Sequence, residues 1–157
     1  MTTMRLVSRE EGERKVRVLI ADDHAPTRSD VRETLEEAGV EVVAEAADGT
    51  AAIEFALRER PDVCILDVSM PHDGLVAAKT ITRQLPETRV VMLTVSASEE
   101  HVLAAARAGA SGYLLKGSDP SRLPFVVRAV AAGESSFPRR LMRRLVEELR
   151  EPTQAAL

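Results

Sequence analysis

The chain has 157 residues, of which 45% are hydrophobic and 29% are charged, and its formal net charge is −4. This length and apolar content favour one folded domain with a core and argue against a disordered polymer. The negative charge argues against nucleic-acid binding through bulk charge and, more weakly, against a membrane-surface role. No apolar run approaches the roughly 20 residues that a membrane helix needs. The first 15 residues lack the apolar segment of a signal peptide.

The single cysteine, Cys64, lies in the apolar run Val63-Cys64-Ile65-Leu66 and has no second cysteine to pair with inside the chain. We interpret it as a small buried hydrophobic residue rather than a reactive thiol. The absence of an internal disulfide makes the cytoplasm the expected compartment.

Strands and helices are predicted to alternate five times along the chain. The predicted strands are the β-branched, apolar segments 15–21, 40–46, 62–67, 89–94 and 111–116. The first three predicted helices cover residues 27–39, the segment from Asp48-Gly49-Thr50 to Pro61, and residues 75–85. The fourth follows the capping-box spacing Ser96–Glu99 and ends at Gly109. The last is indicated by the apolar stripe Leu123, Val126, Val127 and Val130. This order predicts an α/β fold, with a parallel sheet covered by helices on both faces.

Polar residues follow the predicted strands at the points where the strands end. Asp22 and Asp23 follow the first strand, and Asp67, Thr94 and Lys116 end the third, fourth and fifth. The carboxyl ends of parallel strands share one edge of the sheet, where ligands bind near a topological switch point. We therefore expect these five side chains to converge there.

Three neighbouring carboxylates repel one another unless a cation lies among them. Mg²⁺ prefers oxygen ligands and commonly adds a phosphate oxygen to a few carboxylates. A carboxylate beside Mg²⁺ can attack phosphorus to form an acyl phosphate. The Lys116 ammonium and the Thr94 hydroxyl are suited to the phosphoryl oxygens.

Each of these residues also has an ordinary structural interpretation when taken alone. Asp22 or Asp23 could cap the next helix, and Asp67 could be a turn residue. Thr94 could be a structural strand residue, and Lys116 a solvated charge. The combination, in this order at four strand ends, favours a functional site.

The segments LIADDHAPTR, DVCILDVSMPHDG, VVMLTVSA and GASGYLLKG resemble the receiver domains of two-component response regulators. The ADDH opening, the GASGYLLK segment and the later AVAAGE are similar to the NarL/LuxR-type subfamily. The resemblance extends from Val16 to about Glu134. It implies a flavodoxin-like (βα)5 doubly wound parallel sheet with strand order 2-1-3-4-5, which agrees with the pattern of elements.

The resemblance also implies a role for each site residue. Asp67 would be the phosphoacceptor, and Lys116 would contact the phosphoryl group. The metal ligands would be Asp23 and Asp67, the Ser69 backbone carbonyl, and Asp22 acting through water or by orienting its neighbour. Thr94 would move toward the phosphoryl group, and Tyr113 would turn from exposed to buried as it does.

The implied mechanism is a population shift in which phosphorylation favours a different surface on the fourth helix and fifth strand. The donor would be a histidine kinase or a small acyl phosphate such as acetyl phosphate, and the cofactor would be Mg²⁺. The role is signalling, not that of an enzyme acting on a separate substrate. The resemblance leaves room for a phosphorylation-dependent homodimer.

Two features depart from the family pattern. The segment Met70-Pro71-His72-Asp73-Gly74 has one residue fewer between Pro and Gly than most relatives, so we expect the loop path and the start of the third helix to differ from theirs. Pro124 falls in the expected first turns of the last domain helix, where it could delay or kink the helix start.

Histidines receive ordinary interpretations. We expect His24 at the rim of the metal site without being a ligand, because Mg²⁺ favours oxygen. His72 is expected in an exposed loop and His101 on the exposed side of its helix.

Residues 137–150 predict an additional C-terminal amphipathic helix with Leu141, Leu145 and Leu149 four apart, beside Met142 and Val146. It could fold back on the domain, pair with another subunit or lead into a following domain. We divide the chain into an extension (1–14), a receiver domain (15–134) and a linker helix with tail (135–157). NarL/LuxR-type relatives carry a helix-turn-helix domain after such a linker, so we expect DNA contact only through a domain that this chain does not contain.

Three other functions compete with this interpretation. A haloacid-dehalogenase-like phosphatase would need an acid where Ser69 stands, and a flavodoxin-like FMN carrier would need a phosphate loop where Asp22-Asp23-His24 stands. A stand-alone or phosphate-independent receiver, acting as a protein-interaction module, is the remaining alternative. Its usual sign is a missing acid, and none is missing here.

Overall fold

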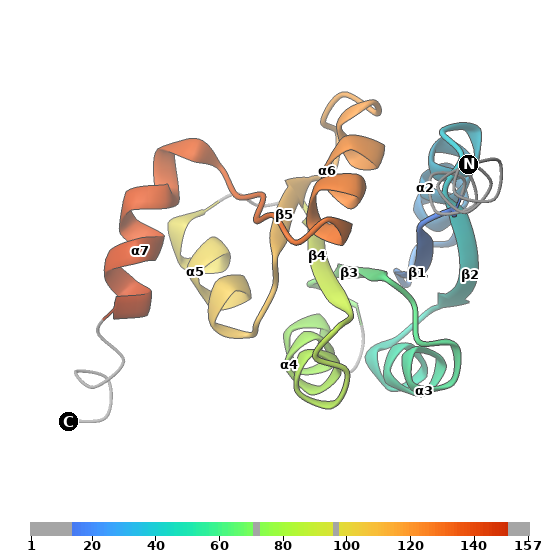
Figure 1. Ribbon diagram of the computed structural model, residues 1–157, viewed down its shortest axis with the longest axis horizontal. Helices are drawn as coiled ribbons and strands as arrows, with labels where there is room; N and C mark the ends of the chain where they lie inside the picture. The colour runs from blue at the N-terminus through green and yellow to red at the C-terminus, as the bar shows by residue number, and fades with distance from the viewer. Residues whose placement is uncertain (1–13, 71–72, 96–97, 151–157) are drawn as a thin grey trace, which may run out of the picture.

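The computed structural model describes residues 14–70, 73–95 and 98–150. Five parallel strands form one sheet in the order β2-β1-β3-β4-β5, as the resemblance implies (Figure 1). The strands are β1 Arg17–Ala21, β2 Glu41–Ala46, β3 Val63–Asp67, β4 Arg89–Thr94 and β5 Gly112–Leu115. Each lies within two residues of its predicted bounds, which confirms the alternation read from the sequence.

Burial along the strands follows their place in the sheet. All five residues of β3, the central strand, are buried, whereas the edge strand β2 is half-buried along most of its length. Cys64 of β3 is a buried free thiol, and burial raises its pKa to about 12. The prediction that Cys64 is a buried hydrophobic residue is confirmed.

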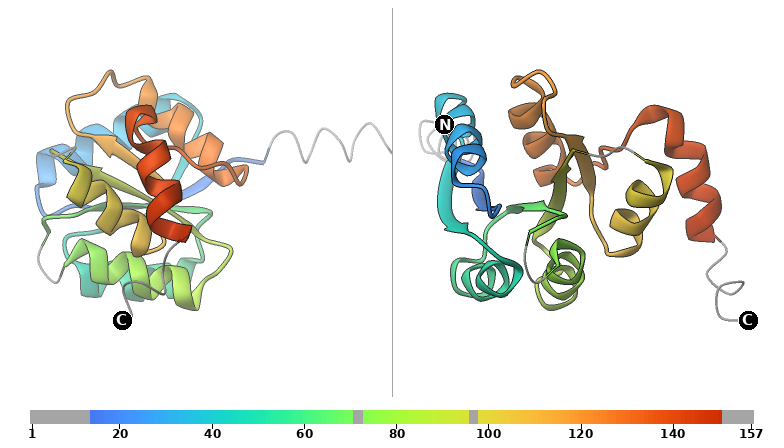
Figure 2. Two further views of the ribbon diagram at one scale, coloured as in Figure 1. Left: turned by 90° about the vertical axis from the view of Figure 1, so that its left-hand side faces the viewer. Right: turned by 180° about the vertical axis from the view of Figure 1, so that it is seen from behind.

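Helices cover both faces of the sheet (Figures 1 and 2). The helices after the strands are α2 Ala25–Glu37, α3 Gly49–Glu59, α4 Gly74–Gln84, α5 Glu99–Arg107 and α6 Arg122–Ala131. One apolar core lies between the sheet and α2 and α6, and it contains the predicted stripe Leu123, Val126, Val127 and Val130. A second core lies under α3, α4 and α5. The sheet is therefore covered on both sides, which explains its apolar strands.

Local capping sets where the helices begin. α2 begins at Ala25, two residues before its predicted start, because His24 caps it and Pro26 suits its first turn. The Asp48 side chain accepts from the Ala51 N–H at 2.8 Å and so caps α3. α5 is capped by Ser98, which accepts from the His101 N–H. The helix thus starts later than the predicted box of Ser96 and Glu99, and Ser96 itself lies outside the described residues.

Pro124 is the third residue of α6, and the helix begins at Arg122. The first N–H groups of a helix have no intrahelical acceptor, so a proline at this position removes no helical hydrogen bond. The concern that Pro124 delays the helix start is therefore not borne out, and Pro124 is buried.

The C-terminal segment folds back on the domain. After a short 3-10 turn, η1 Arg139–Leu141, the helix α7 Met142–Arg150 packs against α5 (Figures 1 and 2). Leu145 is only 3% exposed in the core under α5, and Arg144 Nε pairs with Glu99 Oε1 at 2.8 Å. Of the three predicted placements, the structure has the first. The side chain of Leu149 lies outside what the structure describes.

The segment before α7 extends the sheet by one bridge. Ser136 pairs in parallel with Gly112 of β5, because the Tyr113 N–H donates to the Ser136 carbonyl and the Ser136 N–H donates to the Ser111 carbonyl, both at 2.8 Å. This bridge covers part of the free edge of β5. Within the described ranges, no helix combines the length and apolar character needed to cross a bilayer.

Candidate functional site

The predicted polar residues converge at the carboxyl edge of the sheet. Asp22 and Asp23 follow β1, and the parallel register places the ends of β1, β3 and β4 in line, with Asp67 opposite Leu93. Oxygens of Asp22, Asp23 and Asp67 lie within 4.8 Å of one another. The prediction that these three carboxylates converge is therefore confirmed, because parallel strands bring their carboxyl ends to one edge of the sheet.

The three carboxylates differ in exposure. Asp22 and Asp67 are each 2% exposed, whereas Asp23 is exposed. Charges that are buried close together are unfavourable without a partner of opposite sign, so the cluster needs compensating positive charge. Asp23 is thus the one of these three carboxylates that is accessible to solvent.

Lys116 supplies part of that charge. Its Nζ lies 2.9 Å from Asp22 Oδ2 and 3.2 Å from Asp67 Oδ2. Burial alone would lower the pKa of Lys116, but its contacts with Asp22 and Asp67 outweigh burial and raise it. The lysine is therefore charged, and one ammonium offsets one of the three carboxylate charges.

One buried oxygen of the cluster lacks a hydrogen bond. Asp22 Oδ2 accepts none of ordinary geometry and is compensated by the Lys116 ion pair. Its other oxygen, Oδ1, accepts from the His24 N–H at 2.9 Å. Buried carboxylate oxygens with spare acceptor capacity, grouped with two more carboxylates, fit a hard divalent cation such as Mg²⁺.

Ser69 lies beside the Asp67 carboxylate. Its hydroxyl donates to Asp67 Oδ1 at 3.1 Å and lies 3.3 Å from Oδ2, and its N–H donates to Oδ1 at 3.2 Å. These contacts fix the carboxylate at the end of β3. The predicted metal contact of the Ser69 carbonyl stays a prediction.

The short loop after Asp67 returns tightly to the sheet. Asp73 has a φ of +47° and caps α4 by accepting from the Leu75 N–H at 2.9 Å. A Cβ added at Gly74 would lie 2.2 Å from the Asp67 carbonyl oxygen, so only glycine fits there. Pro71 and His72 lie outside the described residues.

Thr94 and Tyr113 form a polar pair on the other side of the cluster. Thr94 is 5% exposed and Tyr113 is 4% exposed, and their side chains are hydrogen-bonded. Burial raises the pKa of Tyr113, and the hydrogen bond with Thr94 opposes that rise. Tyr113 is thus buried in this structure, and the predicted change from exposed to buried stays a prediction.

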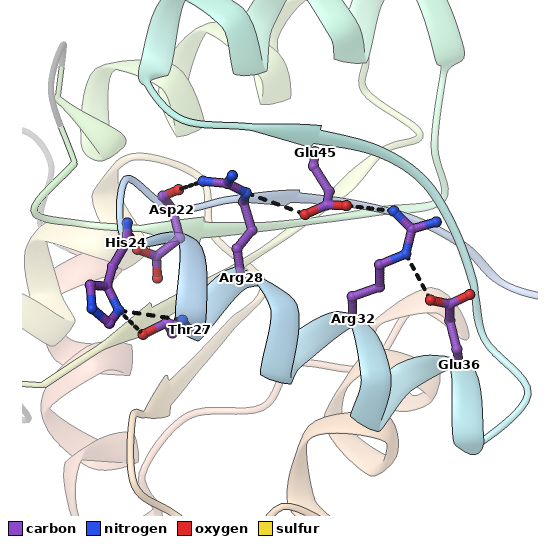
Figure 3. Close-up of polar contacts among 7 residues, drawn as sticks. All are labelled: Asp22, His24, Thr27, Arg28, Arg32, Glu36 and Glu45. Atoms are coloured by element: carbon purple, nitrogen blue, oxygen red, sulfur yellow. Dashed lines mark hydrogen bonds and ion pairs between the residues drawn. The ribbon is translucent and has the colours of Figure 1, made fainter.

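A chain of charged residues beside the cluster was not predicted. Arg28 and Arg32 of α2 both bind Glu45 of β2, and Arg32 also pairs with Glu36 (Figure 3). The four-residue spacing of Arg28, Arg32 and Glu36 gives the helical face. Nothing in the sequence predicted the role of Glu45, because only the fold shows which face of the edge strand this residue lies on. His101 is exposed, as expected, and His24, which was expected at the rim of the metal site, is exposed as well.

Comparisons with known proteins agree with this geometry. A family model described as the response regulator receiver domain matches residues 18–128. An oxygen regulatory protein NreC of Staphylococcus epidermidis is 41% identical over 136 residues, which cover 85% of this chain and 62% of that protein. The chain thus spans less than two thirds of the length of the curated relatives it matches.

Solved structures give the same result. A LuxR-family two-component response regulator from Aurantimonas is 31% identical, with a TM-score of 0.78 over 88% of this chain and 100% of that one. The signal receiver domain of a putative response regulator NarL from Mycobacterium tuberculosis is 38% identical, with a TM-score of 0.73 over 76% and 98%. The isolated REC domain of RcsB from Salmonella enterica, solved with the phosphomimetic BeF3-, is 31% identical, with a TM-score of 0.73 over 83% and 98%. The chain belongs to the response regulator receiver domains, and its relatives are of the NarL/LuxR type.

Proposed function

We propose that this chain is a phosphorylation-controlled signalling domain in which Asp67 accepts a phosphoryl group. The observation that carries the proposal is the cluster of Asp22, Asp23 and Asp67 at the carboxyl edge of the sheet, where the Lys116 ammonium contacts Asp22 and Asp67. Burying charged side chains costs free energy, and clusters of buried charges are common at functional sites.

The residues that would hold Mg²⁺ are Asp23, Asp67 and the Ser69 carbonyl, with Asp22 acting through water or by orienting Asp23. This assignment is supported by the exposed position of Asp23 and by the spare acceptor capacity of Asp22. A bound Mg²⁺ would supply charge neutralisation to the phosphoryl oxygens. The other steps, described below, are carried out by residues of the chain itself.

In the transfer step, an Asp67 oxygen attacks the phosphorus of the donor. The new bond joins that oxygen to phosphorus, and the broken bond releases the imidazole of a histidine kinase or, from acetyl phosphate, acetate. Lys116 Nζ lies against Asp67 Oδ2 and is placed to contact an incoming phosphoryl oxygen. The Ser69 hydroxyl, which now donates to Asp67, is another available donor.

The output is proposed to arise from Thr94 and Tyr113. A phosphoryl group on Asp67 would compete for the Thr94 hydroxyl, which now bonds Tyr113. Because Tyr113 belongs to the core that also holds α5 and Leu145, repacking there would alter the α5–α7 surface. Phosphorylation would thereby change association, including that with a second copy.

The chain has a proposed place in a longer regulator of transcription. We divide it into an extension (1–14), a receiver domain (15–134) and a linker helix with tail (135–157). Its NreC relatives are longer and are named oxygen regulatory proteins. DNA contact would come from a helix-turn-helix domain that follows the linker, and the expected site of action is the cytoplasm.

The test is incubation with acetyl phosphate or beryllofluoride, with and without Mg²⁺, followed by intact mass and by the oligomeric state. Wild type should gain one phosphoryl group from acetyl phosphate only with Mg²⁺, and Asp67→Asn should gain none. Asp23→Ala should keep the fold and lose Mg²⁺ binding in calorimetry. A wild type that gains no adduct would leave a phosphate-independent interaction module as the function. An Asp67→Asn variant that gains an equal adduct would refute Asp67 as the phosphoacceptor.

A further inference from the structure

Arg28 connects the acidic cluster to the edge strand. Its Nη1 donates to the Asp22 carbonyl oxygen at 2.7 Å, and its Nε donates to Glu45 Oε1 at 3.2 Å (Figure 3). The side chains of Arg28 and Glu45 are 22% and 29% exposed, so both contacts are shielded from much of the solvent. Such charge-assisted bonds are stronger than neutral ones.

The Asp22 carbonyl belongs to the peptide unit that joins Asp22 to Asp23. Because a peptide unit is planar, fixing its carbonyl also fixes the direction in which the chain continues to the Asp23 Cα. β1 ends at Ala21, and the Asp22 N–H still donates to the Ala46 carbonyl at 3.0 Å. The Arg28 bond therefore fixes the backbone one peptide unit beyond the hydrogen bonds of the sheet, directly before the exposed Asp23.

Glu45 determines how Arg28 is held. Its two oxygens bind two arginines, Arg28 through Oε1 and Arg32 through Oε2. Glu45 also neighbours Ala46, the residue whose carbonyl receives the Asp22 N–H. One edge strand thus fixes both the amide of Asp22 directly and its carbonyl through Arg28.

We propose that Arg28, oriented by Glu45, is a positioning residue for the metal site, which it serves by fixing the peptide between Asp22 and Asp23. The proposal rests on the proposed function, because it assumes that Asp23 is a Mg²⁺ ligand. The Asp22 oxygen that Arg28 contacts is the backbone carbonyl and not a carboxylate oxygen. Arg28 acts through the backbone that carries Asp23.

An electrostatic effect of Arg28 and a positioning effect of Arg28 predict opposite changes in Mg²⁺ affinity when the residue is removed. Removing a positive charge near an acidic cluster should by charge alone tighten Mg²⁺ binding. Removing a group that holds a ligand in place should weaken it, as the loss of an outer-shell partner does in other metal sites. The direction of the change in Mg²⁺ affinity therefore separates the two.

Arg32 offers a matched control. It binds the same Glu45, carries the same charge and lies one turn along the same helix, but its contacts are with Glu45 and Glu36 and not with Asp22. Arg32→Ala therefore breaks a link between the same helix α2 and the same residue Glu45 of β2, while leaving the Arg28 bond to the Asp22 carbonyl in place.

The experiment is Mg²⁺ calorimetry on wild type, Arg28→Ala and Arg32→Ala. Arg28→Ala should weaken Mg²⁺ binding about tenfold, and Arg32→Ala should leave it unchanged. In acetyl phosphate labelling, Arg28→Ala should need more Mg²⁺ for half its maximal rate, with a near wild-type rate at saturation. If circular dichroism shows that Arg28→Ala does not fold, Arg28→Lys and Arg32→Lys, which keep both charges, take the place of the alanine variants. Arg28→Lys should then weaken Mg²⁺ binding, and Arg32→Lys should leave it unchanged.

The outcomes are distinct. Equal or tighter Mg²⁺ binding by Arg28→Ala, or equal weakening by both alanine variants, overturns the positioning role while wild-type binding upholds the proposed function. A lower saturated rate with an unchanged Mg²⁺ requirement also overturns it, because that result indicates a general structural effect. Wild type that binds no Mg²⁺ overturns the proposed function itself, and this inference with it.

Discussion

The acidic cluster has two unlike flanks. On the α2–β2 flank, Arg28, Arg32 and Glu45 form directional charged contacts, one of which reaches the Asp22 carbonyl. On the β5–α7 flank, Tyr113 and Leu145 lie in an apolar core with α5. Directional bonds define one geometry, whereas apolar packing is non-directional and can be satisfied in more than one arrangement.

This contrast fits the two tasks in the proposed function. Metal ligands must stay in place, which suits the α2–β2 flank. A switch must have two packings of similar free energy, which suits the β5–α7 flank. The contrast predicts that substitutions on the two flanks change the free energy of unfolding by different amounts, and that these changes depend differently on pH and salt.

The largest effect is expected at Leu145. It is 3% exposed in the core under α5, so Leu145→Ala should lower the free energy of unfolding by about 3 kcal/mol through lost burial and a cavity. Urea unfolding measures this change. The neighbour Val146 is 46% exposed, and Val146→Ala should cost less than about 0.5 kcal/mol. Equal costs at the two positions would mean that α7 does not pack on α5 in solution.

The contrast between the flanks also explains what the sequence could predict. Strand order and the acidic cluster follow from apolar runs that end in Asp22, Asp67, Thr94 and Lys116, because parallel strands bring their carboxyl ends together. The apolar stripe of α6 follows from periodicity alone. Such features depend on local pattern and general topology.

Other features depend on tertiary geometry that no local pattern contains. The Arg28–Glu45 contact needs the register of β2 against β1 and the rotation of α2. The cap of α5 is Ser98, and a sequence with serines at both 96 and 98 does not by itself show which of them caps the helix. The docking of α7 was one of three alternatives, since an amphipathic stripe shows that a partner surface exists and not which one.

A smaller effect is expected at Tyr113. Tyr113→Phe removes the hydrogen bond to Thr94 and should cost about 1 kcal/mol of unfolding free energy at neutral pH. Because burial raises the folded pKa of Tyr113 above its ordinary 10.0, the neutral phenol stabilises the fold below about pH 10, and this contribution is lost as pH rises through the higher folded pKa.

The difference between wild type and Tyr113→Phe should therefore be constant up to about pH 10 and shrink above it. Cys64, whose pKa is also raised, is common to both proteins and cancels. The chain has one tyrosine and no tryptophan, so ultraviolet absorbance of the phenolate reports Tyr113 directly. A folded-state midpoint at or below 10.0 would show that Tyr113 is solvated, contrary to its packing here.

The smallest effect is expected at Arg32. It is partly exposed and pairs with Glu36 and Glu45, so Arg32→Ala should cost about 0.5 kcal/mol of unfolding free energy. At about 1 M salt the Debye length falls to about 3 Å, and most of this difference should vanish. The cost of Leu145→Ala should persist at the same salt concentration, because apolar burial is not screened. If salt reduced both costs equally, the two flanks would not differ in the physical nature of their contacts, and the division of tasks between them would lose its basis.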